Sequence, residues 1–145
     1  YASWLFGEPE SVSCVMQNSG ALEIETEDIA DLVVRFQGGV QANIHLDYLN
    51  RNYGRSCIII GDTGTLAWYF QSPSSQVLLV RGTTCELKEG FSGDPDSMYR
   101  AELKHFLACL RGEETPLVTG EDGVRAVALV EAARRSAETR CVVNL

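Results

Sequence analysis

Residues 40–70 read VQANIHLDYLNRNYGRSCIIIGDTGTLAWYF, and this stretch decides the fold. Its first nine residues alternate between apolar and polar side chains, a period of two that is typical of a strand with one buried face. The apolar set is Val40, Ala42, Ile44, Leu46 and Tyr48, and the polar set is Gln41, Asn43, His45 and Asp47. A polar, basic elbow at 50–55 follows, then an apolar strand at 57–60, a turn at 61–64 and an aromatic-rich strand at 65–70. We expect this stretch to form the centre of an antiparallel sheet.

The segments around it predict more strands and then helices. Alternation predicts strands at 10–17 and 29–36 before this stretch, and at 76–80 and 84–88 after it, with an exposed acidic link at 22–28 and a glycine-containing hairpin turn at 37–39. Apolar residues then recur at helical spacing over 98–111, and a capping box at 119–122 opens a second helix that reaches about residue 139. Residues 141–145 are expected to form a last short strand. Strands grouped apart from helices indicate the α+β class: an open, mainly antiparallel sheet with two or more helices packed on one face.

The other face of the predicted sheet is polar and has no element left to cover it. It carries Asp31 and Arg35 in addition to the polar set of the 40–48 strand. This face must meet water or another surface, and we expect the chain to form a homo-oligomer through it, with Gln41, Asn43 and His45 in the interface.

Composition limits the possible partners and the compartment. The chain has 145 residues, enough for one domain with a core, and its formal net charge is −8. Because an acidic chain repels phosphates, we expect no binding to nucleic acid or to an anionic membrane through bulk charge. No apolar run approaches the roughly 20 residues that span a bilayer. The five cysteines are widely spaced within apolar segments, which favours buried, reduced thiols in a cytoplasmic protein.

Three features could carry chemistry, and each has a plainer structural interpretation. The glycines at 61 and 64 invite comparison with a phosphate-binding loop, but no helix follows, and a hairpin turn is the expected structure. His45 and Asp47 lie two residues apart, so they could form half of a metal site or an acid–base pair; a subunit contact or a hydrogen bond within the sheet is the alternative. His105, on the first long helix, is expected to be structural.

The elbow at 50–55 is the polar cluster that most suggests a ligand. Its arginines lie beside tyrosines, and arginine's planar fork suits a bidentate contact with a carboxylate or a phosphate; sugar hydroxyls are further candidates. A solvated turn whose arginines offset the acidic surface is the alternative. The candidate substrate-binding residues are Tyr48, Arg51, Tyr53 and Arg55.

Five segments, in this order, resemble the C-terminal domain of the Gfo/Idh/MocA oxidoreductases. They are WLFGEPESV (4–12), ETEDIADLVVRFQGGV (25–40), IIIGDTGTLAW (58–68), MYRAELKHF (98–106) and GEDGVRAVALVEAARRSA (120–137). The resemblance implies an NAD(P)-dependent enzyme that acts on sugars, cyclitols or nucleotide sugars. It also implies a glyceraldehyde-3-phosphate-dehydrogenase-like C-terminal fold, whose open sheet supplies part of the substrate site and usually the oligomer interface.

The resemblance also implies what this chain should lack. The family's dinucleotide-binding glycines and catalytic lysine lie in an N-terminal Rossmann domain, and its Asp-x-x-x-His segment would fall just before Tyr1. The chain opens with what reads as the last turns of a helix, ended by Gly7. We therefore expect residues 1–145 to be a single C-terminal domain of a larger two-domain dehydrogenase, with NAD or NADP bound by the full-length parent and neither catalytic residues, cofactor nor metal in this fragment. A non-catalytic dimerisation or ligand-binding module and a self-sufficient small enzyme are the alternatives.

Overall fold

The computed structural model describes residues 1–71, 74–94 and 96–145, which form three helices and eight strands. The α+β class predicted from the sequence is confirmed, and the elements fall close to their predicted positions. Within the described residues the chain divides into two compact units: residues 1–50 with 117–145, and residues 51–116. Each unit is described by itself.

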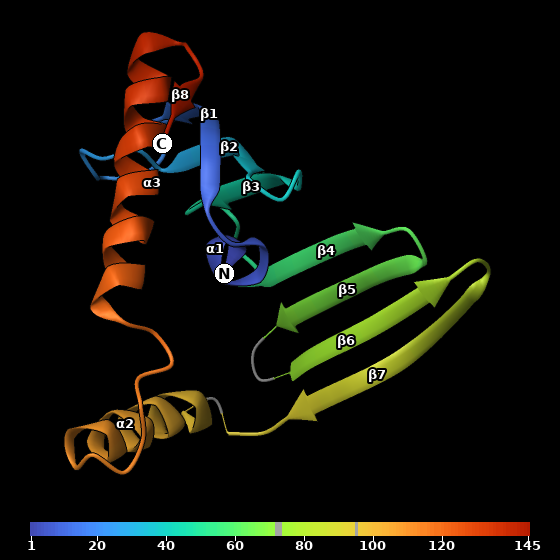
Figure 1. Ribbon diagram of the computed structural model, residues 1–145. Coiled ribbons are helices and arrows are strands. Elements are labelled where there is room, and N and C mark those ends of the chain that lie inside the picture. Colours follow the sequence, from blue (N-terminus) through green and yellow to red (C-terminus); the bar gives the residue numbers. More distant parts are fainter. Residues whose placement is uncertain (72–73, 95) are drawn as a thin grey trace. The chain divides into compact units, whose positions relative to one another are not determined.

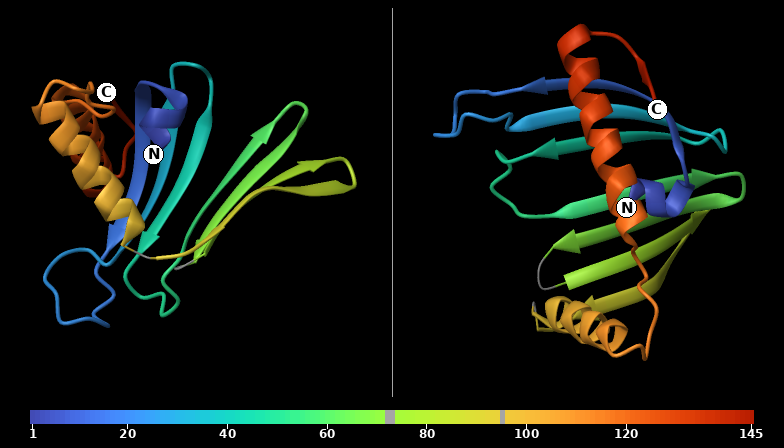
Figure 2. Two further views of the ribbon diagram at one scale, coloured as in Figure 1. Left: turned by 90° about the horizontal axis from the view of Figure 1, so that it is seen from below. Right: turned by 60° about the vertical axis from the view of Figure 1, so that its left-hand side comes forward.

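The first unit is a four-stranded antiparallel sheet, within the described ranges, with a long helix on one face (Figures 1 and 2). Its strands are β1 (Pro9–Gln17), β2 (Ile29–Phe36), β3 (Gln41–Asp47) and β8 (Val143–Asn144), in the order β3-β2-β1-β8. The short α1 (Ala2–Phe6) precedes β1, and α3 (Gly120–Thr139) packs against β1 and β8. Gly39, with a φ of 80°, makes the predicted turn between β2 and β3.

The core of this unit lies between the sheet and α3. The inward residues of β1 and β2 alternate as predicted, and Val34 and Phe36 are fully buried against small side chains of α3 such as Ala133. Phe6 of α1 adds an aromatic contact, with its ring centroid 5.6 Å from that of Phe36. The predicted capping box is confirmed, since Thr119 and Asp122 exchange hydrogen bonds at the start of α3. Small residues on α3 thus let the helix approach the sheet closely.

One polar side chain lies within this core. The Ser136 hydroxyl on α3 is 1% exposed; it accepts a hydrogen bond from the Cys14 backbone N–H at 3.0 Å and donates to the Cys141 carbonyl at 2.6 Å. The pairing of β8 with β1 covers only Ser11 and Val12, so Cys14 lies beyond it. Ser136 therefore satisfies a backbone group that the short β8 does not reach.

The acidic link at 22–28 is exposed as predicted except at its last residue. Asp28 is 2% exposed, and its carboxylate accepts hydrogen bonds from the backbone N–H of Ser19 at 2.8 Å and from the Ser19 hydroxyl at 2.5 Å. The hydrogen bond from the Ser19 hydroxyl has the larger effect, and together with the bond from the Ser19 N–H it lowers the pKa of Asp28 below its ordinary value. The prediction of exposure was wrong here because Asp28 closes the loop between β1 and β2.

The second unit contains the other described sheet and α2. Strands β4 (Arg55–Gly61), β5 (Gly64–Gln71), β6 (Ser74–Arg81) and β7 (Thr84–Ser92) pair in sequence order, each antiparallel to the next (Figure 1). The helix α2 (Ser97–Leu110) follows and begins where the sequence predicted. The segment Ser-Pro-Ser-Ser at 72–75 is typical of a break before a strand, and Asp-Pro-Asp-Ser at 94–97 is typical of a helix start. The first includes residues 72 and 73 and the second includes residue 95, and these three positions lie outside the described residues.

Two expectations need correction. The stretch at 40–70 contributes to both described sheets rather than to the centre of one, because pairing of β3 ends at Asp47 and pairing of β4 begins only at Arg55, beyond the polar elbow. The cysteines, all within the described ranges, are free thiols, but only one is fully buried. Cys85 and Cys141 are exposed, because Cys85 lies just after the turn between β6 and β7 and Cys141 lies in the link between α3 and β8.

Candidate substrate-contact and interface residues

The elbow leads into a cluster of aromatic rings around one guanidinium group. Nη2 of Arg55 donates a hydrogen bond to the Tyr53 hydroxyl, and its guanidinium carbon lies 5.5 Å from the centroid of the Tyr53 ring and 5.8 Å from that of Phe70. The Tyr53 and Phe70 rings meet edge to face at 6.2 Å. Cation–π contacts of this kind hold an arginine in a fixed direction.

The hairpin between β4 and β5 explains why these residues meet. Gly61 pairs with Gly64, and counting away from the turn along each strand places Arg55 opposite Phe70. A Cβ on Gly64 would lie 2.7 Å from the Val80 carbonyl oxygen, so the approach of β5 to β6 requires glycine there. The hairpin interpretation of this glycine pair is thus confirmed.

Sequence reasoning missed two aromatic members of this cluster, Phe70 and Trp68. The Trp68 ring stacks near Phe70 with centroids 6.4 Å apart, and its indole N–H donates to the Ser75 hydroxyl at 2.9 Å. The signal that could have found them is the same hairpin register, which puts residues 68 and 70 on the face that carries Arg55.

The other two predicted substrate residues lie elsewhere along the chain. Tyr48 belongs to the first unit, its side chain is exposed, and its backbone N–H bonds to the Asp28 carbonyl at 3.0 Å. Arg51 is exposed and is the first residue of the second unit. The structure therefore brings together Tyr53 and Arg55 of the four candidates.

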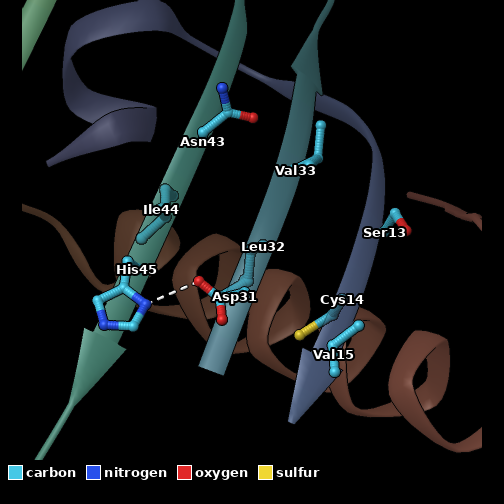
Figure 3. A pocket seen from close by; sticks show the side chains of 9 residues that line it. All are labelled: Ser13, Cys14, Val15, Asp31, Leu32, Val33, Asn43, Ile44 and His45. Atoms are coloured by element: carbon cyan, nitrogen blue, oxygen red, sulfur yellow. Dashed lines mark hydrogen bonds and ion pairs between the residues drawn. The ribbon is translucent and has the colours of Figure 1, made fainter. Parts of the chain in front are cut away.

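The face of the β1–β2–β3 sheet opposite α3 carries the three predicted interface residues. Strand register arranges its side chains in rows across the strands, each with one residue from β1, β2 and β3 in that order. The rows are Val15, Asp31 and His45; Ser13, Val33 and Asn43; and Ser11, Arg35 and Gln41. Two of these rows line a shallow pocket of about 330 Å³, seen in Figure 3. Polar and aliphatic side chains alternate over the three rows, and we call the face that they form the open face.

His45 is held between two carboxylates on this open face. Its Nδ1 lies 2.7 Å from Asp31 Oδ1, and its Nε2 lies 3.2 Å from Asp47 Oδ2 (Figure 3 shows the first contact). The hydrogen bond to Asp31, followed by the charges of both carboxylates, raises the pKa of His45 above 6.5. Asp47 also accepts hydrogen bonds from two backbone N–H groups of the following turn, and its pKa is lowered.

Asp31 is the partner of His45 that sequence spacing did not reveal. It lies 14 positions away but directly across the β2–β3 ladder, and counting from the turn at Gly39 would have found it. Within the part of the chain that the structure describes, no three His, Cys, Asp or Glu side chains are placed to hold a metal ion. The cluster is a hydrogen-bonded group of one imidazole and two carboxylates at the β3 edge of the open face.

The first unit, an antiparallel sheet with a helix packed on one face and exposed polar and aliphatic side chains on the other, is typical of an α+β protein. Residues 1–145 match the family described as "Oxidoreductase family, C-terminal alpha/beta domain". The chain belongs to this family, the Gfo/Idh/MocA oxidoreductases.

Solved structures agree with this assignment. The chain is 26% identical to the WlbA dehydrogenase from Bordetella pertussis, a complex with NADH and UDP-GlcNAcA, with a TM-score of 0.72 over 99% of this chain and 40% of that one. It is 24% identical to the aldose-aldose oxidoreductase from Caulobacter crescentus complexed with glycerol, with a TM-score of 0.80 over 99% of this chain and 44% of that one. The chain therefore spans less than half the length of these proteins. No curated protein sequence matches it. No helix among the described residues is long and apolar enough to cross a membrane.

Proposed function

We propose that these 145 residues are the C-terminal substrate-binding and oligomerisation domain of an NAD(P)-dependent oxidoreductase that acts on a sugar, cyclitol or nucleotide sugar. The observation that carries this proposal is the family match over the whole chain. A dehydrogenase bound to NADH and a nucleotide sugar and an aldose oxidoreductase are among the similar structures. Hydride transfer and dinucleotide binding would be the work of the remainder of a longer, two-domain enzyme. Free thiols at all five cysteines suit its placement in the reducing cytoplasm.

The Arg55 cluster supports the substrate-binding part of the proposal. An arginine steadied by two aromatic rings presents N–H donors to an anionic or hydroxyl-rich ligand at little cost in side-chain entropy, and aromatic surface beside it offers an apolar contact. Arg51 and Tyr53, which belong to the same unit as Arg55, are proposed to extend this contact surface, and Tyr48 of the first unit is proposed as a separate substrate contact. Their role is to orient the substrate, and orientation contributes to rate.

Kinetics of the intact enzyme test this assignment. Arg55→Ala is expected to raise KM by about ten-fold or more, the loss of one hydrogen bond from a charged donor, and Arg55→Lys to recover only part of it because the planar fork is gone. Arg81→Ala, which removes an exposed arginine at the end of β6, is the matched control. Unchanged kinetics for Arg51→Ala and Arg55→Ala would assign both arginines to a solvated turn. Ligand binding without turnover of any sugar or cyclitol would instead favour a non-catalytic module.

The open face supports the oligomerisation part. Val15 and Val33, 68% and 42% exposed, place aliphatic surface among hydrogen-bonding side chains, a mixture that suits a protein–protein contact. Gln41, Asn43 and His45 are proposed to lie in the interface between two copies of the chain. A symmetric pair would bring the same rows together from both copies.

Sedimentation equilibrium of the chain tests this interface. Val33→Asp adds a charge at the centre of the open face and is expected to convert dimer to monomer. Val124→Asp, at an exposed valine on α3, is the matched control and should leave the dimer intact. A wild-type chain that stays monomeric at high concentration would refute the proposed interface.

A further inference from the structure

Three side chains that neither proposed site uses meet at the end of α2 in the second unit. His105 Nε2 lies 3.6 Å from Cys109 Sγ, and His105 Nδ1 lies 2.5 Å from Glu114 Oε2. The thiol, the imidazole and the carboxylate thus form a continuous line of contacts. The imidazole side chain is 28% exposed and Cys109 is half-buried, so the group is sheltered but within reach of small molecules.

Local sequence explains how the three residues come together. His105 and Cys109 are four positions apart on α2, so they lie on one face of the helix, one turn apart. The helix then ends in a Schellman motif: Gly112 has a φ of 73° and its N–H bonds to the Cys109 carbonyl, while the Glu113 N–H bonds to the Ala108 carbonyl. This reversal folds the chain back along the helix and delivers Glu114 to the imidazole.

The contacts determine how the protons are arranged. A carboxylate beside Nδ1 can only accept, so Nδ1 carries the proton that it donates to Glu114, and in the neutral form of the ring the lone pair of Nε2 faces the thiol. Nε2 is therefore placed to accept the S–H proton. A nucleophile in contact with a base that a third group orients is the arrangement that activates cysteine in enzymes.

We propose that Cys109 is a modification site that forms a mixed disulfide with small disulfides. As the Cys109 sulfur attacks one sulfur of the disulfide, a new S–S bond forms, the original S–S bond breaks, and the thiol proton passes to His105 Nε2. The departing thiolate takes that proton and leaves as a thiol, so the exchange consumes one disulfide and releases one thiol. Glu114 is a positioning residue that acts through the imidazole.

The other four cysteines provide an internal comparison, and one of them, Cys57, is half-buried like Cys109. Cys85 and Cys141 are more exposed than Cys109, so exposure alone would make them react first. Burial raises the pKa of the Cys14 thiol, which keeps it protonated and slow. The chain has only two histidines, and His45 contacts Asp31 and Asp47. The contacts among Cys109, His105 and Glu114, which we call the relay, therefore predict the opposite order from exposure: Cys109 reacts first.

Mass spectrometry of the chain treated with bis(2-hydroxyethyl) disulfide at pH 7 tests the proposal. This disulfide is neutral and small, so charge does not bias the comparison. The mixed disulfide is expected to form at Cys109 at least about ten-fold faster than at Cys85 or Cys141, a threshold set below the roughly hundred-fold at which general-base effects typically begin. Unfolding the chain in urea should bring the three rates together. A Cys109 rate no higher than that of Cys85 in the folded chain would overturn the proposal.

Variants separate the relay from a purely structural effect. His105→Gln should lower the Cys109 rate about ten-fold, whereas His45→Gln, at the other histidine, should leave it unchanged. Glu114→Gln keeps an oxygen that accepts the Nδ1–H and should retain more of the rate than Glu114→Leu. Equal Cys109 rates in wild type and His105→Gln would also overturn the proposal. If His105→Gln fails to fold, the wild-type comparison and the two Glu114 variants still decide.

Discussion

Replacing Ser136 with alanine tests whether one hydroxyl stabilises the joint between α3, β1 and the C-terminal strand. The substitution removes a single oxygen from a site that is 1% exposed, and alanine is a good helix former, so helix propensity opposes any loss. The Cys14 N–H, whose hydrogen bond to Ser136 is buried, would lose this acceptor. The Cys141 carbonyl would lose a donor, but this residue is exposed and water can replace it.

The magnitude follows from these two groups. A buried N–H left without a partner costs about 1–3 kcal/mol, and the loss of a bond at a wet carbonyl adds about 0.5–1 kcal/mol. After about 0.5 kcal/mol for the higher helix propensity of alanine is subtracted, Ser136→Ala should lower the free energy of unfolding by about 1–3.5 kcal/mol. Against a typical total of about 5–15 kcal/mol, this is a large fraction for one atom.

Urea denaturation of the chain, followed by circular dichroism, measures this change. Ser13→Ala is the matched control, because Ser13 lies one residue from Cys14 on β1 but is exposed on the open face; its effect should stay within about 0.5 kcal/mol. A loss of less than about 0.5 kcal/mol for Ser136→Ala would refute the reasoning, since it would mean that water or a backbone shift satisfies the Cys14 N–H.

Three further predictions concern charge and backbone strain. The raised pKa of His45 reflects stabilisation of its charged form, so its contribution to the free energy of unfolding should be complete below pH 6.5 and lost as the pH rises through the raised value. Asp31→Asn should lower the His45 pKa in an NMR titration, and an unchanged pKa would exclude the ion pair. The lowered pKa of Asp28 has the opposite sign: its contribution to the free energy of unfolding is present above pH 3.8 and lost as the pH falls further. Ser19→Ala should weaken the loss of melting temperature in acid, and identical profiles of melting temperature against pH for variant and wild type would contradict this. Arg140 ends α3 with a φ of 57°, so Arg140→Gly should raise the melting temperature by removing strain of roughly 1 kcal/mol; a lower melting temperature would argue against that strain.

The positions of the helices and strands could be predicted because their signals are local. Alternation in β1, β2 and β3 and the capping box at Thr119 each depend on residues a few positions apart, and the structure places them as predicted. The division of the strands between sheets could not be predicted in the same way. Alternation at residues 40–48 shows which side of a strand is buried, but it does not show which neighbour its edge pairs with.

The candidate sites show the same limit. Tyr53 and Arg55 are two residues apart and were expected to act together, whereas Phe70 joins them only through the register of a hairpin. His105 and Cys109 have the spacing of helical neighbours, but Glu114 reaches them only because a glycine in the left-handed region reverses the chain. Such contacts depend on turn geometry, and turn geometry sets distances that sequence spacing alone does not.

The hydrogen bond from Cys14 to Ser136 has a consequence for aggregation. β8 covers only the first part of the outer edge of β1, and beyond it a side chain of α3 occupies the next backbone donor. One helix therefore shields both the apolar face of the sheet and part of its edge. If α3 detached transiently, apolar surface and unpaired strand backbone would be exposed in the same event, and both favour pairing with a strand from another molecule. The rate at which α3 detaches from the sheet therefore sets how often this unit can aggregate.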